Sequence, residues 1–312
     1  MGYFSLRKIS IYTGLSVLKI FIFMGIFGSH LAPYELTYQK GVEYVVEKGE
    51  PKLSAPPFGP STEHILGTDQ WGYDILTKIL YGAKYTIFPV ILISLFIIVI
   101  GVIFGSFMGL VYQQRSRKNN KYIKVIVSSG LPSFLIIYFI LSGINFNSIF
   151  SPLELILFTS FLIVLLGFPS IANTIYLLIL EVKNKPYVEA SITLGGRSLH
   201  IFTTHIYPHI KVNILSLTIS QCIQTLQLLG VLSIFNIFLG GTYYTETPYL
   251  FFSITNEWSG LIGQSRSNIY GNEWILLSPL TFYIILLLAF YLIYYGISEY
   301  GNRNYVYKKE KG

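Results

Sequence analysis

Long apolar runs separated by short polar segments make up most of the 312-residue chain. Five of these runs are long enough for the roughly 20 helical residues that cross a hydrocarbon core of about 30 Å. A sixth run, residues 9–32, is interrupted by Lys19, whose side chain we expect to reach the membrane surface or face a neighbouring helix rather than serve an ion pathway. The pattern therefore predicts six transmembrane helices. The five uninterrupted runs are residues 86–112, 122–142, 153–180, 211–239 and 275–297.

The first run has an alternative interpretation as a secretory signal. Arg7 and Lys8 precede it, and the segment "GSHLA" near its end resembles a cleavage region. The run is long for a signal, and five remaining helices would leave the chain ends on opposite sides of the membrane, so a membrane span is favoured. The chain then forms a single transmembrane domain, residues 1–312. Its long connections are an extracytoplasmic loop with an amphipathic helix (33–85), a cytoplasmic loop (181–210) and a second extracytoplasmic loop (240–274).

Composition and charge agree with an all-α integral membrane protein. Hydrophobic residues make up 52% of the chain and charged residues 12%, against about 25% charged residues in an average soluble domain. In a six-span topology, the segments that share a side with the chain ends carry 15 of the 22 Lys and Arg residues but only 4 of the 15 acidic ones. The positive-inside rule places that side in the cytoplasm of a multi-pass plasma-membrane protein. The net charge of +7 then needs no nucleic-acid partner. Cys222 is the single cysteine, which excludes an internal disulfide and a thiolate metal cluster.

The polar segment between the fourth and fifth runs, residues 187–210, reads YVEASITLGGRSLHIFTTHIYPHI. Pro186 suits the first turn of a helix, and Glu189 lies near the N-terminus of that helix, where the helix dipole favours a negative charge. Gly195 then provides a left-handed stop, and Ser198 is expected to cap a second short helix. Each helix has an apolar stripe too short to be stable alone. The segment therefore predicts a helix pair that binds a partner surface in the cytoplasm.

A second polar stretch, residues 64–87, contains Asp69 and Asp74, the only aspartates in the chain. The two carboxylates could form an acid and base pair of the kind that hydrolases use. A structural role is favoured, in which Asp69 caps a helix that begins near Gln70 and Asp74 pairs with Lys78 one turn later.

Three histidines in the cytoplasmic segment, His200, His205 and His209, raise the question of a metal site. Pro208 is expected to break the helix between the last two, and no carboxylate lies nearby at ligand spacing. We therefore predict no metal site.

Small residues inside the second apolar run predict how that helix packs. Gly101, Gly105 and Gly109 form a repeated small face, which favours close packing against another helix.

Polar side chains in the third and fifth runs could form hydrogen bonds between helices or to a passing solute, and some of them are expected to line a translocation path. These residues are Ser129, Ser133, Ser220, Gln221, Gln224 and Thr225.

The cytoplasmic segment resembles the "EAA" loop of ABC importer permeases. Glu189-Ala190-Ser191, then Gly195, then Ile206-Tyr207-Pro208 follow the spacing of that loop. Ser191 replaces the second alanine and Tyr207 the usual leucine, and neither change moves the register. The resemblance implies a coupling helix that inserts into a cleft on an ATPase subunit. The implied coupling residues are Glu189, Ala190, Ser191, Gly195, Gly196, Ile206 and Pro208.

The outer stretch, HILGTDQWGYDILTKILYGAKYTI, resembles the segment before the second span in the second permease subunit of dipeptide, oligopeptide and nickel importers. The pattern of that family is HxLGTDxxGRDxxSRxxYGxR. Tyr73, Thr77, Lys78 and Lys84 replace its arginine, serine, arginine and arginine, so Tyr73 cannot form any salt bridge that the family's first arginine makes. The segments "LAPYE" and "EWSGLI" also resemble elements of the family. The retained motif positions are Gly67, Thr68, Asp69, Gly72, Asp74, Tyr81 and Gly82.

The resemblance implies the membrane subunit of an ATP-driven importer for peptides or a related small solute such as a nickel chelate. Its partners would be a homologous permease, two ATP-binding subunits and an extracytoplasmic solute-binding protein. The chain has no GxxxxGK[ST] phosphate loop, so ATP and Mg²⁺ would bind to the partner subunits, and this chain would carry no cofactor and no enzyme activity. The alternatives are an ion-coupled secondary transporter and a membrane-embedded enzyme. The first would need ionisable residues near the midplane and an internal repeat, and the second a convergent catalytic set within the membrane.

The charge asymmetry generates a test of topology. Cysteines introduced at Lys118 and Lys309 should react with a membrane-impermeant thiol reagent only after the cells are opened. A cysteine at Lys48 should react in intact cells that expose the outer face. Labelling of position 118 from outside would contradict the predicted orientation.

Overall fold

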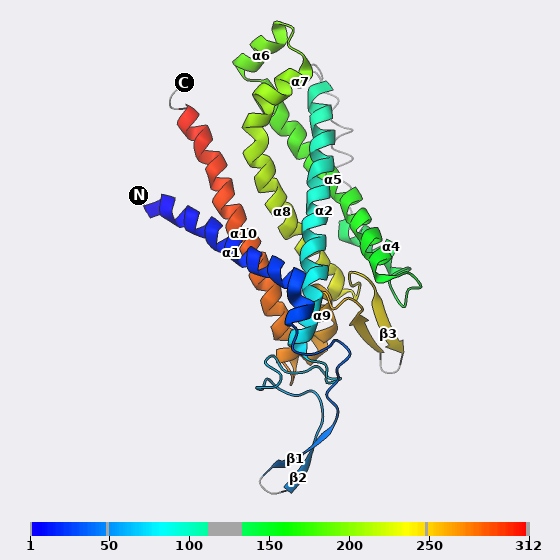
Figure 1. The fold of residues 1–312 in the computed structure, drawn as a ribbon. Coiled ribbons are helices and arrows are strands. Elements are labelled where there is room, and N and C mark those ends of the chain that lie inside the picture. The colour runs from blue at the N-terminus through cyan, green and yellow to red at the C-terminus, as the bar shows by residue number, and fades with distance from the viewer. Residues whose placement is uncertain (1, 48–49, 112–132, 247–248, 310–312) are drawn as a thin grey trace.

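The computed structural model describes residues 2–47, 50–111, 133–246 and 249–309, and these residues are mainly helical, as predicted (Figure 1). Five helices in this part of the chain are long and apolar enough to cross a membrane. Of the third predicted span, residues 122–142, residues 122–132 lie outside the described residues, and the remainder corresponds to α4 (Ser133–Ser142). The five long helices are α1 (Gly2–Leu31), α2 (Ile75–Val111), α5 (Pro152–Lys183), α8 (Tyr207–Ile234) and α10 (Trp274–Lys309).

Local sequence explains where the fourth predicted span begins. Ser151 caps α5 in a capping box, in which the Ser151 hydroxyl accepts a hydrogen bond from the backbone N–H of Glu154 and the Glu154 carboxylate accepts one from the N–H of Ser151. Pro152 follows in the first turn, where a missing N–H costs nothing. The helix then continues through Pro169 to Lys183.

Several helix boundaries differ from the expected spans: α1 begins at Gly2 rather than residue 9, and α10 ends at Lys309 rather than residue 297. The second span does not begin at residue 86 after a separate amphipathic helix, because α2 runs without interruption from Ile75. The fifth helix ends at Ile234 rather than at residue 239, and Asn236 then adopts a left-handed conformation with φ of 60°. The apolar run of residues 211–239 therefore continues for several residues after α8 ends at Ile234.

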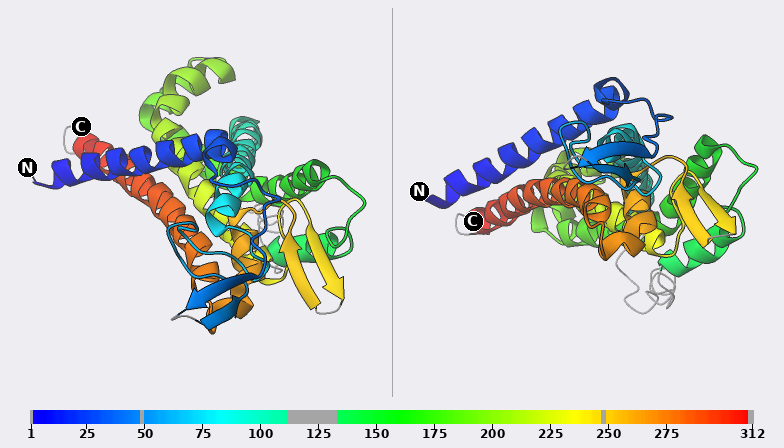
Figure 2. Two further views of the ribbon diagram at one scale, coloured as in Figure 1. Left: turned by 60° about the horizontal axis from the view of Figure 1, so that its bottom comes forward. Right: turned by 90° about the horizontal axis from the view of Figure 1, so that it is seen from below.

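Two β-hairpins, which the sequence analysis did not predict, project from one end of the helices (Figures 1 and 2). Strands β1 (Glu43–Glu47) and β2 (Glu50–Ser54) pair antiparallel in the first outer loop. Strands β3 (Thr242–Glu246) and β4 (Tyr249–Ser253) pair antiparallel in the second. A short helix, α9 (Trp258–Ser265), follows the second hairpin. The short helix pair predicted within residues 187–210 lies at the opposite end of the molecule (Figure 1).

The predicted small face of α2 packs directly against α5. An added Cβ at Gly105 would lie 2.5 Å from the carbonyl oxygen of Ala172, and one at Gly101 would lie 2.6 Å from the Ile171 side chain. A Cβ at Gly109 would lie 2.8 Å from Ile179. The glycines therefore let the two backbones approach more closely than any larger residue would allow, which confirms the expected packing role.

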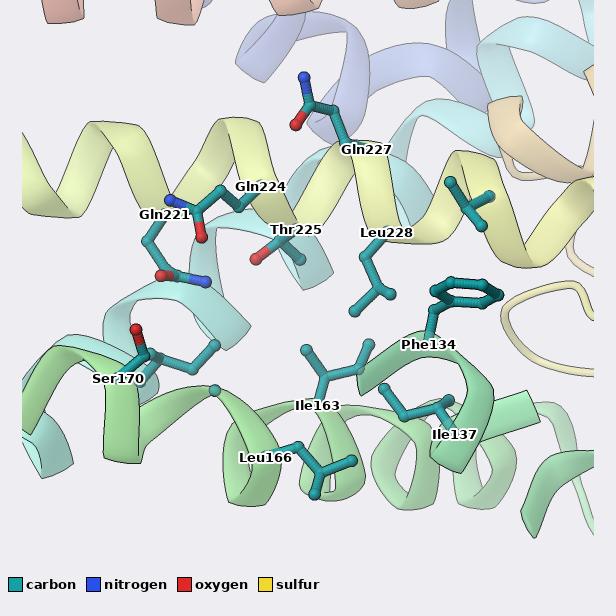
Figure 3. A pocket seen from close by; sticks show the side chains of 13 residues that line it. Phe134, Ile137, Ile163, Leu166, Ser170, Gln221, Gln224, Thr225, Gln227 and Leu228 are labelled. Carbon is teal, nitrogen blue, oxygen red and sulfur yellow. The ribbon is translucent and has the colours of Figure 1, made fainter. Parts of the chain in front are cut away.

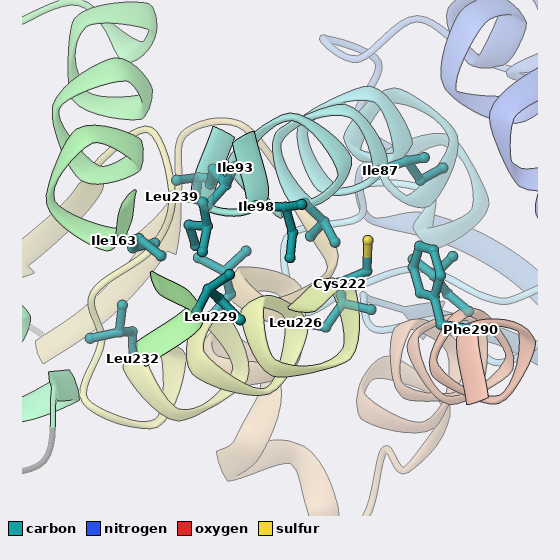
Figure 4. Packing of buried hydrophobic residues seen from close by; sticks show 14 of the residues in the cluster. Ile87, Ile93, Ile98, Ile163, Cys222, Leu226, Leu229, Leu232, Leu239 and Phe290 are labelled. Atoms are coloured by element: carbon teal, nitrogen blue, oxygen red, sulfur yellow. The ribbon is translucent and has the colours of Figure 1, made fainter. Parts of the chain in front are cut away.

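The buried core joins α2 to α8 and α10 (Figure 4). Ile98 of α2 faces Cys222 and Leu226 of α8, and Phe290 of α10 closes the cluster beside Cys222. Large apolar side chains also cover the outward face of α2, where Phe107 is exposed. A helix that is apolar on both its packed and its exposed faces is expected of a membrane span.

The α2–α5 contact generates a stability prediction. Gly105→Leu would force the two helices apart at a backbone carbonyl, and we expect a loss of stability of about 1–3 kcal/mol from overpacking. The measurement is the thermal unfolding midpoint of the detergent-purified protein. Gly143→Leu is the control, since nothing lies within 4 Å of a Cβ at that position. Equal midpoints for the two variants would contradict the packing role.

Candidate functional site

The segment after α5 forms the expected pair of short helices, α6 (Pro186–Thr193) and α7 (Ser198–Ile201). Gly195 between them has φ of +80°, which confirms the left-handed turn. The predicted cap at Ser198 is wrong. Arg197 has the extended backbone of the N-cap, and no side chain caps this helix, so Ser198 is the first helical residue.

The predicted break at Pro208 is also wrong. A π-helical turn, η1 (Phe202–Ile206), continues α7 into α8, and Pro208 lies in the first turn of α8. A proline lacks an N–H, and the first turn of a helix does not need one. The second short helix and the fifth predicted span therefore form one continuous helical path.

The helix pair has one side that is buried against the bundle and one side that is exposed. Val188, Ile201 and Ile206 are buried and hold the pair against the bundle. Leu194 is 88% exposed and Leu199 is 73% exposed, although both side chains are apolar. Of the predicted coupling residues, Ser191 is half-buried, Ile206 is buried, and the others are exposed: Glu189, Ala190, Gly195, Gly196 and Pro208.

A hydrogen bond fixes the start of α6 to the start of α8. The Tyr187 hydroxyl and Nε2 of His209 lie 2.7 Å apart. The ring of His205 also packs near Tyr187, with centroids 6.0 Å apart. No group of three or more His, Cys, Asp or Glu side chains among the described residues could hold a metal ion. The aromatic contacts instead fix the angle at which the helix pair leaves the bundle.

At the opposite end of the bundle, Asp74 caps α2. Its Oδ2 accepts a hydrogen bond of 2.7 Å from the backbone N–H of Thr77, and its Oδ1 accepts one of 3.0 Å from Nδ1 of His64. All of these groups are buried. The prediction that Asp74 pairs with Lys78 is therefore wrong, because its carboxylate is directed at the helix start.

Asp69 takes the role that was predicted for Asp74. Its Oδ1 accepts hydrogen bonds from the backbone N–H groups of Trp71 and Tyr73 at 2.9 and 3.0 Å, and its Oδ2 pairs with Lys78. The Lys78 ammonium also lies 4.7 Å from the centre of the Tyr73 ring. Tyr73 thus contacts a cation through its ring face at the position where the family pattern has arginine.

Close backbone contacts explain the glycines of the outer motif. Gly72 has φ of +85°, and a Cβ there would lie 2.1 Å from the carbonyl oxygen of Lys40. A Cβ at Gly82 would lie 1.8 Å from the carbonyl oxygen of Asn256, where the second outer loop crosses α2. The remaining motif positions also serve the loop fold: Gly67 has positive φ, Thr68 is buried, and Tyr81 is half-buried. The outer motif is therefore a structural element and not a catalytic pair.

Trp258 anchors the second outer loop on α2. Its backbone N–H donates to Oγ1 of Thr86 and its indole Nε1–H donates to the carbonyl of Ile79, both at 2.9 Å, and the side chain is fully buried. The neighbouring Glu257 is also buried and accepts hydrogen bonds from the Leu239 N–H and the Ser259 hydroxyl. Burial raises the pKa of the Glu257 carboxyl above its ordinary value. Sequence reasoning missed Glu257, because a single Glu in a polar loop gives no signal of burial.

A cavity of about 360 Å³ lies between α8, α5, α4 and α2 (Figure 3). Three of the predicted path residues, Gln221, Gln224 and Thr225, line it. Ser220 does not line it, and its hydroxyl accepts a hydrogen bond from Gln224. Ser133 is the first residue of α4, and Ser129 lies outside the described residues. Lining residues that the sequence analysis did not identify are Ile97, Phe134, Ile137, Ile163, Leu166, Gly167, Ser170, Gln227, Leu228 and Val231.

The buried Glu257 carboxyl generates a prediction of pH dependence. In the unfolded chain, this carboxyl loses its proton near the ordinary pKa of about 4.3. The folded protein keeps the proton until the pH reaches the raised pKa. Between these two pKa values the group therefore lowers the free energy of unfolding as the pH rises. Glu257→Gln removes that titration, and its thermal midpoint should fall less over the same pH range. The exposed Glu273→Gln is the control and should keep the wild-type slope. Identical slopes for all three proteins would contradict the prediction.

Comparison with known proteins identifies the family. Residues 101–305 match the family model described as "Binding-protein-dependent transport system inner membrane component". The chain is 27% identical over 199 residues to the dipeptide transport system permease protein DppC of Bacillus subtilis, covering 63% of this chain and 54% of that relative. It is also 27% identical over 226 residues to the oligopeptide transport system permease protein OppC of Bacillus subtilis, covering 71% and 66% of the two chains. The chain therefore spans less than two thirds of the length of these two relatives.

The family model covers more than half of the chain, and the two motifs that resemble importer permeases lie at opposite ends of the helical bundle. The chain belongs to the family of binding-protein-dependent transport system inner membrane components, which are membrane transport subunits and not enzymes.

Proposed function

We propose that the protein is the permease subunit of an ATP-driven importer for peptides and forms half of the translocation pathway. The observation that carries this proposal is the helix pair α6–α7, which projects beyond the bundle and presents polar and apolar side chains that nothing in the described chain covers (Figure 1). An exposed apolar surface of this kind is typical of a protein contact. The contact would transmit movement between the membrane helices and ATPase subunits.

The geometry of the helix pair supports a mechanical role. The left-handed turn at Gly195 sets the angle between α6 and α7, and the hydrogen bond between Tyr187 and His209 fixes α6 to the base of α8. Because α7 continues through η1 into α8, a force on the exposed tip would pass along one helical path to the residues that line the cavity. Glu189, near the N-terminus of α6, would act at the subunit contact rather than in any bond-breaking step.

The names of the relatives support peptides as the transported solute. Both similar permeases from Bacillus subtilis are named for peptide transport, of dipeptides in one case and oligopeptides in the other. This favours a peptide over the nickel chelate that the outer motif alone would allow.

The proposed partners are a second permease, two ATP-binding subunits that hold ATP and Mg²⁺, and an extracytoplasmic solute-binding protein. We place the chain in the plasma membrane with both ends and the helix pair in the cytoplasm. The charge asymmetry of the sequence supports this orientation. The hairpins and α9 would then face the binding protein.

Gly195→Val tests the coupling role. A β-branched residue would meet a penalty of about 1 kcal/mol or more in the left-handed conformation. No atom lies within 4 Å of a Cβ at this position, so the cost arises from the backbone and not from a clash. The variant should insert and join the second permease, while ATPase co-purification and peptide uptake by the same membranes fall together. Glu189→Ala should weaken both less completely.

Gly271→Val is the matched control for backbone strain. Gly271 also has positive φ, 111°, and no atom lies within 4 Å of a Cβ there, but it lies in the outer loop after α9. It should leave ATPase co-purification unchanged. Gly195→Asn is a second control, because asparagine tolerates the left-handed region and should retain most uptake. Full ATPase association and full uptake by Gly195→Val would refute the coupling role.

A further inference from the structure

Among the three glutamines of α8, Gln221 alone is buried, whereas Gln224 and Gln227 are exposed. The Gln221 side chain is 7% exposed, it lies near the middle of the helix, and none of the described residues hydrogen-bonds to its amide. The amide points into the cavity, toward α5 (Figure 3). The nearby Thr225 hydroxyl, in contrast, shares a hydrogen bond of 3.1 Å with Ser94 of α2. Gln221 therefore has free hydrogen-bonding capacity that faces an open volume.

The Gln221 amide is at the surface of the cavity and is not enclosed by protein on all sides. Its donor and acceptor capacity is not used in a bond to another helix, so both remain available to a group that enters the cavity. Such convergent polar groups in a mainly apolar cavity are typical of a ligand site. The cavity supplies the space for that ligand.

The walls of the cavity limit the chemistry of the ligand. Apart from the glutamines, Thr225 and Ser170, the described lining residues are apolar or glycine, and none of them is charged. Ile163 of α5 points toward α8 across the cavity (Figure 3), and Leu166 of α5 also lines the cavity. A charged group that entered this volume would lose its hydration without gaining a counter-ion. The walls therefore favour an uncharged group.

A glutamine side chain and a peptide bond are complementary. The amide nitrogen of Gln221 can donate to a carbonyl oxygen, and its amide oxygen can accept from an N–H. A peptide bond offers both groups within one planar unit. The volume of about 360 Å³ is within the range of about 300–1,000 Å³ for small-molecule sites, so the cavity can hold part of a short peptide.

We propose that this cavity is a transient binding subsite for one peptide bond and one uncharged side chain of the transported solute. Gln221 binds the peptide bond, and the apolar wall of α5 contacts the side chain. The site lies within this single subunit, near the middle of the bundle. The proposal rests on the proposed function as a peptide permease and adds which part of the solute the subunit contacts.

Photo-crosslinking during transport tests the subsite. The probe is a tripeptide with a central photo-leucine, an uncharged diazirine side chain, added to membranes that contain the complete transporter and its binding protein. After illumination, mass spectrometry maps the adducts, and the adduct on the binding protein is the internal standard. We expect adducts on cavity residues of α5 and α8. In Gln221→Met, which keeps the side-chain length and removes the amide, their yield relative to the standard should fall on the order of fivefold, as the loss of one hydrogen bond predicts.

Thr218→Val is the matched control, because Thr218 is on the same helix, is not among the residues that line the cavity, and its hydroxyl donates a hydrogen bond of 2.9 Å to the carbonyl of Ile214. Its relative yield should equal that of the wild type. If the wild type takes up the probe but its adducts form outside the cavity, the subsite proposal is wrong. This outcome is measured on the wild type and does not depend on how any variant folds. Equal yields in wild type and Gln221→Met would also overturn it. A wild type that crosslinks no peptide and takes none up would instead refute the proposed peptide function, and the subsite with it.

Discussion

Helices in a bilayer gain little by hiding apolar surface from one another, because lipid chains are as apolar as their side chains. Association then depends on how closely the backbones pack. The contact between α2 and α5 meets this constraint through Gly101, Gly105 and Gly109, which bring α2 against the backbone and isoleucines of α5. At the end of the same contact, Nζ of Lys183 donates a hydrogen bond of 2.9 Å to the carbonyl of Gly109. The other features of the bundle are built around this pair.

The outer end of α2 has a different kind of support. Asp74 caps the helix and is itself held by His64, while Trp258 donates hydrogen bonds to Thr86 and to the carbonyl of Ile79. These bonds fix the second outer loop to the same helix that packs on α5. The motif of residues 64–87 is thus connected through α2 to the cavity and to the opposite end of the bundle.

The polar residues of α8 fall into two groups with different physical roles. Thr225 is paired with Ser94 of α2, and Ser220 with Gln224, so these groups are satisfied within the protein. Gln221 is buried and unpaired beside a cavity. All of them look alike in the sequence, as polar positions in an apolar run. Only the arrangement of α2, α5 and α8 separates a group that joins helices from one that is available to a solute.

The sequence by itself determined the features that depend on a residue and its immediate neighbours. Run lengths predicted the membrane helices, the small residues of α2 predicted a close contact, and the "GG" turn predicted the left-handed conformation at Gly195. Tertiary structure decided which carboxylate caps α2 and which pairs with Lys78, because both aspartates are near the helix start in sequence and only the fold of the loop directs each side chain. It also decided that Glu257 is buried and that Gln221 faces a cavity, since burial and partnership depend on segments that are distant in the chain. Local preference acts over one or two turns, whereas the cost of an unpaired polar group is set by whatever the fold brings within hydrogen-bonding distance.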